Sequence, residues 1–241
     1  MKTVAVVLAA GKGVRMKSDI PKVSHVIFGK QMVVWVLEAI KSLNIEKVFV
    51  VVGYKAEMVR EECGGFDAAF IEQREQLGTG HAVMQTAPFI REATVLILPG
   101  DMPLIKPETL RRLIESHTSK NASATVLTAA LENPFSYGRI IRSADGQISK
   151  IVEQKDATAP ELSVNEVNSG AYCFNSKDLF SALEKVRPDN VQKEYYLTDV
   201  IGILKGEGLP VYAYKAEDPG EIVGINTIEE LKKLELRGMP H

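Results

Sequence analysis

Short apolar runs alternate with helical periodicities through the first half of the chain. The strand-like runs cover residues 3–9, 47–52, 68–72 and 94–98. Between and after them, apolar residues recur at helical spacing in residues 31–43, 55–62, 79–89 and 107–117. This alternation is typical of βαβ units and predicts a mostly parallel sheet with helices on its faces. Ligands of such sheets bind beyond the carboxyl ends of the strands, so we look for chemistry in the loops there.

The second half of the chain has a different pattern. Strand-like runs occur at residues 123–131, 138–142 and 147–153, and Asp145-Gly146 between the last two is a strong hairpin signal. Helical periodicity returns at residues 176–186, 195–206 and 227–237, with a strand-like run at 210–215. The predicted fold is therefore a Rossmann-like, doubly wound α/β sheet that is mostly parallel, flanked by helices and extended by antiparallel strands in its second half.

Composition narrows the class of protein. With 241 residues, 45% hydrophobic and 25% charged, the chain has enough apolar material for a core without a metal or disulfide staple. Its 29 basic and 31 acidic residues nearly balance, giving a net charge of −2, which does not provide the positive field needed for non-specific nucleic-acid binding. An anionic ligand would therefore need a local arrangement of donors. We find no membrane-length apolar run and no signal-peptide pattern. We therefore expect a cytoplasmic protein without nucleic-acid or membrane partners; its oligomeric state is left open.

The run that closes the first strand is rich in glycine: Leu8-Ala9-Ala10-Gly11-Lys12-Gly13-Val14-Arg15-Met16. Its glycines allow backbone N–H groups to approach an anion, and Arg15 and Lys22 supply cations for successive phosphates. A dinucleotide fingerprint would need glycine at Met16, and a Walker A loop would need Ser or Thr where Gly13 stands. The loop therefore suits a nucleoside triphosphate, although a glycine turn with solvated basic residues explains it equally well when taken alone.

Two more strand ends carry candidate ligands. Gln73 follows the run at 68–72 and can pair with a base edge, while Gly78 and Thr79 open a helix with free N–H groups. The structural alternative is that Thr79 only caps that helix. Asp101 follows the run at 94–98 and suits Mg²⁺, a cation that prefers oxygen, although most such residues serve turns. Asn226 has a comparable alternative as a cap of the last helix.

Taken together, these segments resemble the sugar-1-phosphate nucleotidyltransferases. Among these, the chain is most similar to the uridyltransferase domains of the bifunctional bacterial N-acetylglucosamine-1-phosphate uridyltransferase/glucosamine-1-phosphate acetyltransferases. The similarity extends from residue 4 to about residue 230 and includes Leu-Ala-Ala-Gly-Lys-Gly-x-Arg-Met from residue 8, Ser-Asp-x-Pro-Lys-Val from 18, Glu-Gln-Leu-Gly-Thr-Gly-His-Ala from 75, Gly-Asp-x-Pro-Leu from 100, Tyr-Gly-Arg-Ile from 137, Ile-Val-Glu-x-Lys-Asp-Ala from 151 and Glu-Tyr-Tyr-Leu-Thr-Asp from 194. Each block is weak alone, but their common order is specific.

The resemblance implies a role for each matching residue. Arg15 and Lys22 would act on the phosphates as catalytic residues, and Asp101 and Asn226 would bind Mg²⁺. The expected substrate-binding residues are Leu8, Ala9, Ala10, Gly11, Lys22, Gln73, Gly78, Thr79, Pro99, Gly100, Asp101, Gly138, Glu153, Asn168 and Asn226. Within this set, Gln73, Gly78 and Thr79 would read the base. Gly138, Glu153 and Asn168 would surround the N-acetylglucosamine moiety. Pro99 stands where family members often have an aromatic residue.

The reaction implied by the resemblance is transfer of a uridylyl group. UTP and N-acetylglucosamine 1-phosphate would give UDP-N-acetylglucosamine, a cell wall precursor, and pyrophosphate, with Mg²⁺ as cofactor. Two alternatives stay open: transfer to another sugar 1-phosphate such as glucose 1-phosphate, and a catalytically silent subunit that binds a nucleotide sugar. A glycosyltransferase is disfavoured because Met102 and Pro103 follow Asp101, so there is no Asp-x-Asp metal motif.

The resemblance also implies a domain organisation. We expect a nucleotidyltransferase domain at residues 1–228 and a C-terminal helix and tail at 229–241. The bifunctional enzymes continue into a left-handed β-helix of hexapeptide repeats that carries the acetyltransferase, and no such repeat occurs in these 241 residues. The expectation is that this chain makes the nucleotide sugar without acetylating glucosamine 1-phosphate, whether it is a free-standing enzyme or a shortened one.

Overall fold

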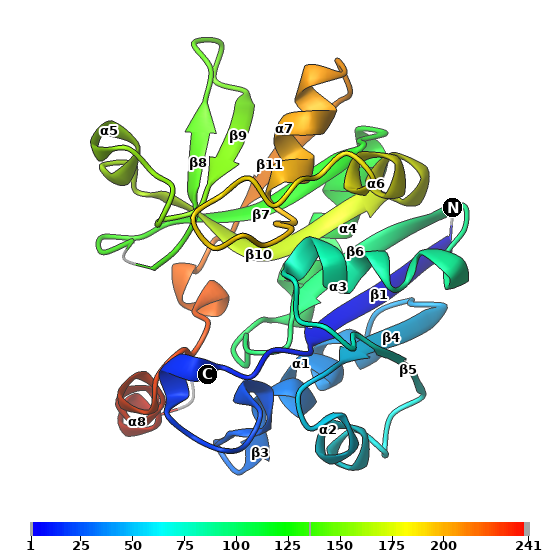
Figure 1. Ribbon diagram of the computed structural model, residues 1–241, viewed down its shortest axis with the longest axis vertical. Helices are drawn as coiled ribbons and strands as arrows, with labels where there is room; N and C mark the ends of the chain where they lie inside the picture. The colour runs from blue at the N-terminus through cyan, green and yellow to red at the C-terminus, as the bar shows by residue number, and fades with distance from the viewer. Residues whose placement is uncertain (1, 135, 239–241) are drawn as a thin grey trace.

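A twisted sheet with helices on both faces forms the centre of the molecule (Figure 1). The computed structural model describes residues 2–134 and 136–238, and within them this sheet has nine strands. Its main path runs in the order β11 (Val211–Lys215), β7 (Ala124–Ala130), β10 (Glu166–Asn175), β6 (Ala93–Pro99), β1 (Lys2–Ala9), β4 (Lys47–Val52) and β5 (Ala68–Glu72). A hairpin of β8 (Arg139–Arg142) and β9 (Ile148–Val152) joins it through β10.

Strand direction divides the sheet into two halves. Strands β5, β4, β1 and β6 are parallel, so their carboxyl ends meet at one edge. Strand β10 runs antiparallel between β6 and β7, and the β8–β9 hairpin extends this second half. The predicted mixed sheet is confirmed. The sequence favours a strand around Cys173 but gives it no bounds, and β10 is that strand. Its register shifts between Asn168 and Tyr172, so a bulge places polar residues and a glycine inside a strand.

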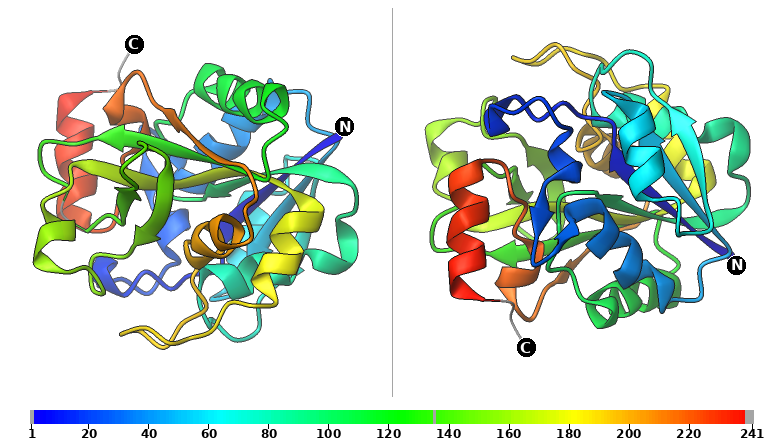
Figure 2. Two further views of the ribbon diagram at one scale, coloured as in Figure 1. Left: turned by 90° about the horizontal axis from the view of Figure 1, so that it is seen from above. Right: turned by 90° about the horizontal axis from the view of Figure 1, so that it is seen from below.

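Helices cover both faces of the sheet, which Figure 2 shows from above and below. On one face lie α1 (Met32–Lys41), α2 (Ala56–Glu62) and α4 (Pro107–Ser119). On the other lie α3 (Thr79–Met84), α6 (Ser176–Leu183) and α7 (Asp199–Gly206). Strand β1 supplies both cores because its side chains alternate: Val4 and Val6 pack on the α3 side, and Ala5 and Val7 on the α1 side. No described helix is long and apolar enough to cross a membrane.

Two predicted helices are shorter in the structure. The prediction at residues 79–89 divides into α3 and a 3₁₀ helix, η3 (Ala87–Phe89), because Pro88 cannot continue an α-helix. The helix predicted at 195–206 is observed only from Asp199, as α7. The preceding residues bond to the segment before α3: Tyr195 N–H donates to the Leu77 carbonyl, and Gly80 N–H donates to the Tyr195 carbonyl, both at 2.8 Å. These long-range bonds replace the first turn of the predicted helix.

A small third core joins the two ends of the chain. The last helix, α8 (Ile228–Arg237), lies beside the N-terminal loops (Figures 1 and 2). Met16, Met32, Ile225 and Leu231 pack together there. The cluster includes the hairpin of β2 (Val26–Ile27) and β3 (Lys30–Gln31) and the 3₁₀ helix η1 (Val14–Met16). Further short helices are η2 (Lys22–Ser24), α5 (Ala159–Leu162) and η4 (Pro219–Ile222). The boundary at residue 228 stays a prediction, and residues 239–241 of the predicted tail lie outside the described residues.

Candidate active site

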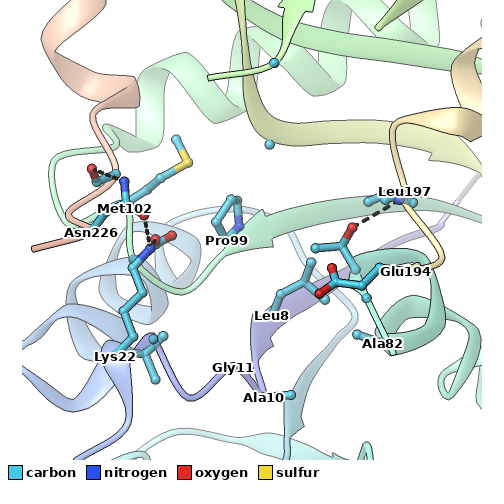
Figure 3. A pocket seen from close by; sticks show the side chains of 18 of the residues that line it. Leu8, Ala10, Gly11, Lys22, Ala82, Pro99, Met102, Glu194, Leu197 and Asn226 are labelled. Carbon is cyan, nitrogen blue, oxygen red and sulfur yellow. Dashed lines mark hydrogen bonds and ion pairs between the residues drawn. The ribbon is translucent and has the colours of Figure 1, made fainter. Parts of the chain in front are cut away.

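A cavity of about 560 Å³ opens at the carboxyl edge of the parallel strands. Its walls come from the loops after β1, β5 and β6, from the β8–β10 region and from residues near 194–198 and 224–226. Figure 3 shows Lys22 and Asn226 at one end and Glu194 and Leu197 at the other, with Leu8 and Pro99 between them. The predicted site residues that line the cavity are Leu8, Ala10, Gly11, Arg15, Lys22, Gln73, Gly78, Thr79, Pro99, Asp101, Gly138, Glu153, Asn168 and Asn226.

Two predicted site residues lie behind this lining. Ala9 is buried in the core on the α1 side of the sheet. Gly100 donates its N–H to the Leu8 carbonyl at 2.9 Å, and a Cβ there would lie 2.9 Å from the same oxygen. Both residues therefore shape the strand ends that carry Leu8 and Asp101, but neither residue lines the cavity itself.

The glycine-rich loop folds back on Lys22. Gly13 has φ +70°, and a Cβ at this position would come within 2.4 Å of Lys22 Cβ. Glycine is thus required both by the left-handed backbone and by the close approach. Tyr54, which the sequence analysis did not single out, supports the loop from β4: its N–H donates to the Ala10 carbonyl at 3.0 Å, and the Lys12 ammonium lies 5.2 Å from its ring centroid.

Cationic side chains converge at the end of the cavity marked by Lys22. The Asn226 Oδ1 atom accepts from Arg15 Nη2 at 2.7 Å and from Lys22 Nζ at 2.5 Å. Lys22 also forms an ion pair with Asp101, and both of these side chains are largely buried. A single amide oxygen, more than 200 positions away in the sequence, therefore aligns both cations. We call this group of four residues the phosphate end.

Asn226 does not cap the last helix, which was the structural alternative to its role as a ligand. Thr227 caps α8 instead, because its hydroxyl accepts the Glu230 N–H at 3.1 Å. The Asn226 side chain lines the cavity, and its Nδ2 donates to the Gly224 carbonyl at 3.2 Å. Tyr137, which the sequence analysis placed in a motif without giving it a role, holds this segment by accepting the Gly224 N–H at 3.1 Å. Burial raises the pKa of Tyr137, so its hydroxyl stays protonated.

The two predicted metal ligands, Asp101 and Asn226, lie close together at the phosphate end. The Asp101 carboxylate and the Asn226 amide oxygen both contact the Lys22 ammonium, so they are spaced to share one cation. Both are hard oxygen donors, and Mg²⁺ in proteins takes one or two such ligands with phosphates and water. Among the described residues no group of three or more His, Cys, Asp or Glu could hold a metal. This pair fits Mg²⁺ that completes its coordination with phosphate oxygens and water.

Gln73 marks a second part of the cavity, which we call the base end. Gln73 follows β5 and is buried, and its Nε2 donates to the Gly78 carbonyl at 3.1 Å. Thr79 does not cap α3; Gly78 occupies that position, and the Thr79 hydroxyl accepts the Leu197 N–H at 3.0 Å. Gly78 has φ +113°, and a Cβ there would lie 2.6 Å from the Tyr195 carbonyl oxygen. The base end is therefore packed against the segment before α7.

Glu153 and Asn168 form a third part, the sugar end. Burial raises the pKa of Glu153, whose Oε1 accepts from the Thr198 hydroxyl at 3.3 Å. Asn168 lies beside the β10 bulge, where its Oδ1 accepts the Gly170 N–H at 3.2 Å. Cavity-lining residues that the sequence analysis did not propose here are Tyr172, Glu194 and Thr198. The Glu-Tyr-Tyr-Leu-Thr-Asp block at residue 194 was the available signal for the last two.

Comparisons with known proteins identify a family and several relatives. Residues 5–199 match the MobA-like NTP transferase domain. The chain is 50% identical over 234 residues to the bifunctional protein GlmU of Bacillus cereus strain G9842, and 48% identical over 235 residues to that of Alkaliphilus oremlandii. These alignments cover 96% and 98% of this chain but 51% of each relative, so the chain spans about half the length of these proteins.

The fold has a counterpart among solved structures. A structure of UDP-glucose pyrophosphorylase complexed with UDP-glucose superposes with a TM-score of 0.74 at 17% identity, covering 97% of both chains. This likeness establishes the architecture of the sheet and its helices. Together with the family match over residues 5–199, it confirms the predicted nucleotidyltransferase fold. The chain belongs to the MobA-like NTP transferase domain family.

Proposed function

We propose that the protein transfers a uridylyl group from UTP to N-acetylglucosamine 1-phosphate, giving UDP-N-acetylglucosamine and pyrophosphate. The observation that carries this proposal is the single cavity that joins the base end, the phosphate end and the sugar end. A nucleotide sugar has the same three parts: a base, phosphate groups and a sugar. The resemblance to uridyltransferase domains of bifunctional enzymes supports uracil as the base and the N-acetylated sugar.

The residues of the chain act by positioning and by charge. A phosphate oxygen of the sugar phosphate attacks the α-phosphorus of UTP, and the bond from that phosphorus to the oxygen of the leaving pyrophosphate breaks. The attacking oxygen is already ionised near neutral pH, so no general base is required. Arg15 and Lys22, aligned by Asn226, bind the phosphate oxygens and stabilise their charge. Mg²⁺ bound at Asp101 and Asn226 would neutralise further charge on the transferring phosphate.

The sugar end orients the acceptor. Glu153 lies in a buried position at the cavity wall and can accept hydrogen bonds from sugar hydroxyls. Asn168 and Gly138 line the same region, and a Cβ at Gly138 would lie 3.5 Å from Glu153 Oε2. A larger residue at Gly138 would therefore crowd both Glu153 and a bound sugar.

A substrate panel tests the proposal. Pyrophosphate release is measured with each nucleoside triphosphate in turn against N-acetylglucosamine 1-phosphate and glucose 1-phosphate, with Mg²⁺ or with EDTA. We expect the highest kcat/KM for UTP with N-acetylglucosamine 1-phosphate and no release in EDTA. A higher value with glucose 1-phosphate would assign a different acceptor. Binding of UDP-N-acetylglucosamine without turnover would identify a silent binding subunit instead.

A further inference from the structure

The 3₁₀ helix η2 begins with Lys22, whose side chain reaches toward Asn226 at the phosphate end (Figure 3). Its other two residues, Val23 and Ser24, are each 4% exposed. The helix packs against α1 and α2. Because η2 is a single turn, the placement of Val23 and Ser24 also fixes where the Lys22 side chain begins.

Close packing limits the movement of η2 toward the neighbouring loops. Val23 belongs to the core on the α1 side of the sheet, and a Cβ at Gly100 would lie 3.0 Å from its Cγ1. A Cβ at Gly13 would lie 2.4 Å from Lys22 Cβ. Such apolar contacts keep η2 from moving closer but have little directional preference. A hydrogen bond is needed to fix how η2 is turned.

Ser24 supplies this directional contact. Its hydroxyl donates to Glu62 Oε2 at 2.7 Å, between residues 38 positions apart in the sequence. Glu62 is the last residue of α2. Among the described residues, the Ser24 hydroxyl is the only side chain that forms a hydrogen bond with the Glu62 carboxylate. This bond therefore ties the short helix that carries Lys22 to the end of α2.

The electrostatics of α2 do not favour a carboxylate at Glu62. Burial raises the pKa of Glu62, the hydrogen bond from Ser24 lowers it, and the neighbouring Glu61 raises it. A carboxylate in the last turn also meets the negative end of the helix dipole. The contact with Ser24 offsets these costs. The attachment of η2, rather than the stability of α2, accounts for a carboxylate at this position.

We propose that Ser24 and Glu62 are positioning residues whose hydrogen bond holds η2 so that the Lys22 ammonium lies at the phosphate end. This inference rests on the proposed function, in which Lys22 binds phosphate oxygens. Neither Ser24 nor Glu62 lines the cavity, so both act through Lys22. A small displacement of a group that stabilises the transition state lowers kcat more than it weakens substrate binding.

Substitutions on both sides of the bond test the proposal through pyrophosphate release. Ser24→Ala and Glu62→Ala each remove the bond, and we expect each to lower kcat by about tenfold with a smaller change in KM for UTP. The double variant should be no slower than either single variant, because the same bond is lost in all three. Glu62→Gln keeps an acceptor oxygen for the Ser24 hydroxyl and should retain most of the wild-type kcat.

Ser176→Ala is the matched control for Ser24→Ala. Ser176 is 2% exposed, and its hydroxyl accepts the Ala93 N–H at 3.0 Å, away from the cavity lining. This variant should lower the melting temperature as Ser24→Ala does but leave kcat unchanged. An equal loss of kcat in both variants would assign the effect to general destabilisation and overturn the proposal. An unchanged kcat in Ser24→Ala would overturn it as well.

Labelling of Lys22 reports its placement without turnover. Lys22 is shielded by its ion pair with Asp101, whereas an exposed, unpaired lysine reacts quickly with an amine-directed reagent. We expect mass spectrometry to show faster labelling of Lys22 in Ser24→Ala than in the wild type or in Ser176→Ala. Labelling at the wild-type rate in Ser24→Ala would overturn the role of Ser24. A wild-type protein that releases no pyrophosphate with UTP would instead overturn the proposed function, whatever the labelling shows.

Discussion

The phosphate end and the sugar end of the cavity differ in their electrostatics: the first gathers cations, and the second contains a buried carboxyl group. At the phosphate end, Arg15 and Lys22 converge on one amide oxygen of Asn226. At the sugar end, burial raises the pKa of Glu153. Just outside the cavity lining, burial and the neighbouring Asp156 raise the pKa of Asp199. One end gathers cations for a polyanion, and the other holds desolvated acids that suit an uncharged polyol. Under the proposed function, this difference favours the phosphates of the nucleotide sugar at the first end and its sugar at the second.

The two ends also come from different parts of the fold. The phosphate end is assembled from loops at the carboxyl edge of the parallel strands and from the residue just before α8, and Arg15 and Asn226 are 211 positions apart. The sugar end comes from the antiparallel addition, where β9 leads to Glu153 and β10 carries Asn168. Substitutions at the two ends should therefore affect different steps: chemistry at one and acceptor binding at the other.

Replacing Arg15 by alanine tests the phosphate end most severely. We expect Arg15→Ala to lower kcat for pyrophosphate release on the order of 10³-fold, because the guanidinium stabilises charge on the transferring phosphate. Circular dichroism and thermal unfolding should match the wild type, since Arg15 is exposed and its hydrogen bond to Asn226 is a surface contact. Arg111→Ala is the matched control, because Arg111 is an exposed arginine outside the cavity. Near-normal turnover by Arg15→Ala would overturn the assignment of this end.

Asn226 provides a second test of the same end. Asn226→Ala removes the oxygen that both cations share and one of the two oxygens that fit Mg²⁺. We expect the Mg²⁺ concentration for half-maximal activity to rise by about 10- to 100-fold. Thr227→Ala is the control, since it removes the cap of α8 and costs about 1 kcal/mol of stability without touching the cavity. An equal shift in both variants would mean that only the placement of α8 matters.

Glu153 tests the sugar end. Glu153→Gln keeps the shape of the side chain but weakens it as an acceptor for sugar hydroxyls. We expect KM for N-acetylglucosamine 1-phosphate to rise by about tenfold, with little change in the affinity for UTP measured by calorimetry. Glu217→Gln, at an exposed carboxylate outside the cavity, should leave both values unchanged. A loss of UTP affinity in Glu153→Gln would remove the distinction between the two ends.

The parallel half of the fold could be read from the sequence more completely than the antiparallel half. The strand ends before Gly11, Gln73 and Asp101 were predicted because parallel strands bring their carboxyl ends to one edge. The bounds of strand β10 could not be predicted because Asn168-Ser169-Gly170 interrupts its apolar alternation. In its bulge Gly170 packs on Pro99, where a Cβ would lie 2.8 Å from Cγ, and this contact is not local in sequence. The part played by Tyr137 depends on Gly224, 87 positions away, and no local pattern encodes such a contact.

The smallest expected effect concerns stability at the sugar end. Burial, with Asp156 nearby, raises the pKa of Asp199 from 3.8 to about 6. A carboxyl whose folded pKa is raised stabilises the fold while it is protonated, and that stability is lost as pH rises through about 6. Asp199→Asn remains uncharged at every pH. Its free energy of unfolding should therefore equal that of the wild type near pH 4 and exceed it by about 1–2 kcal/mol at pH 8.

Asp178 gives this last prediction a matched control. Asp178 and Asp199 both lie in the first turn of eight-residue helices, α6 and α7. A negative charge there favours the helix by about 0.3–1 kcal/mol, so Asp178→Asn should slightly destabilise the protein at pH 8. Urea unfolding of both variants at pH 4, 6 and 8 measures the difference. If Asp199→Asn lost stability at pH 8 as Asp178→Asn does, the helix N-terminus would outweigh burial, and the sugar end could not be described as desolvated.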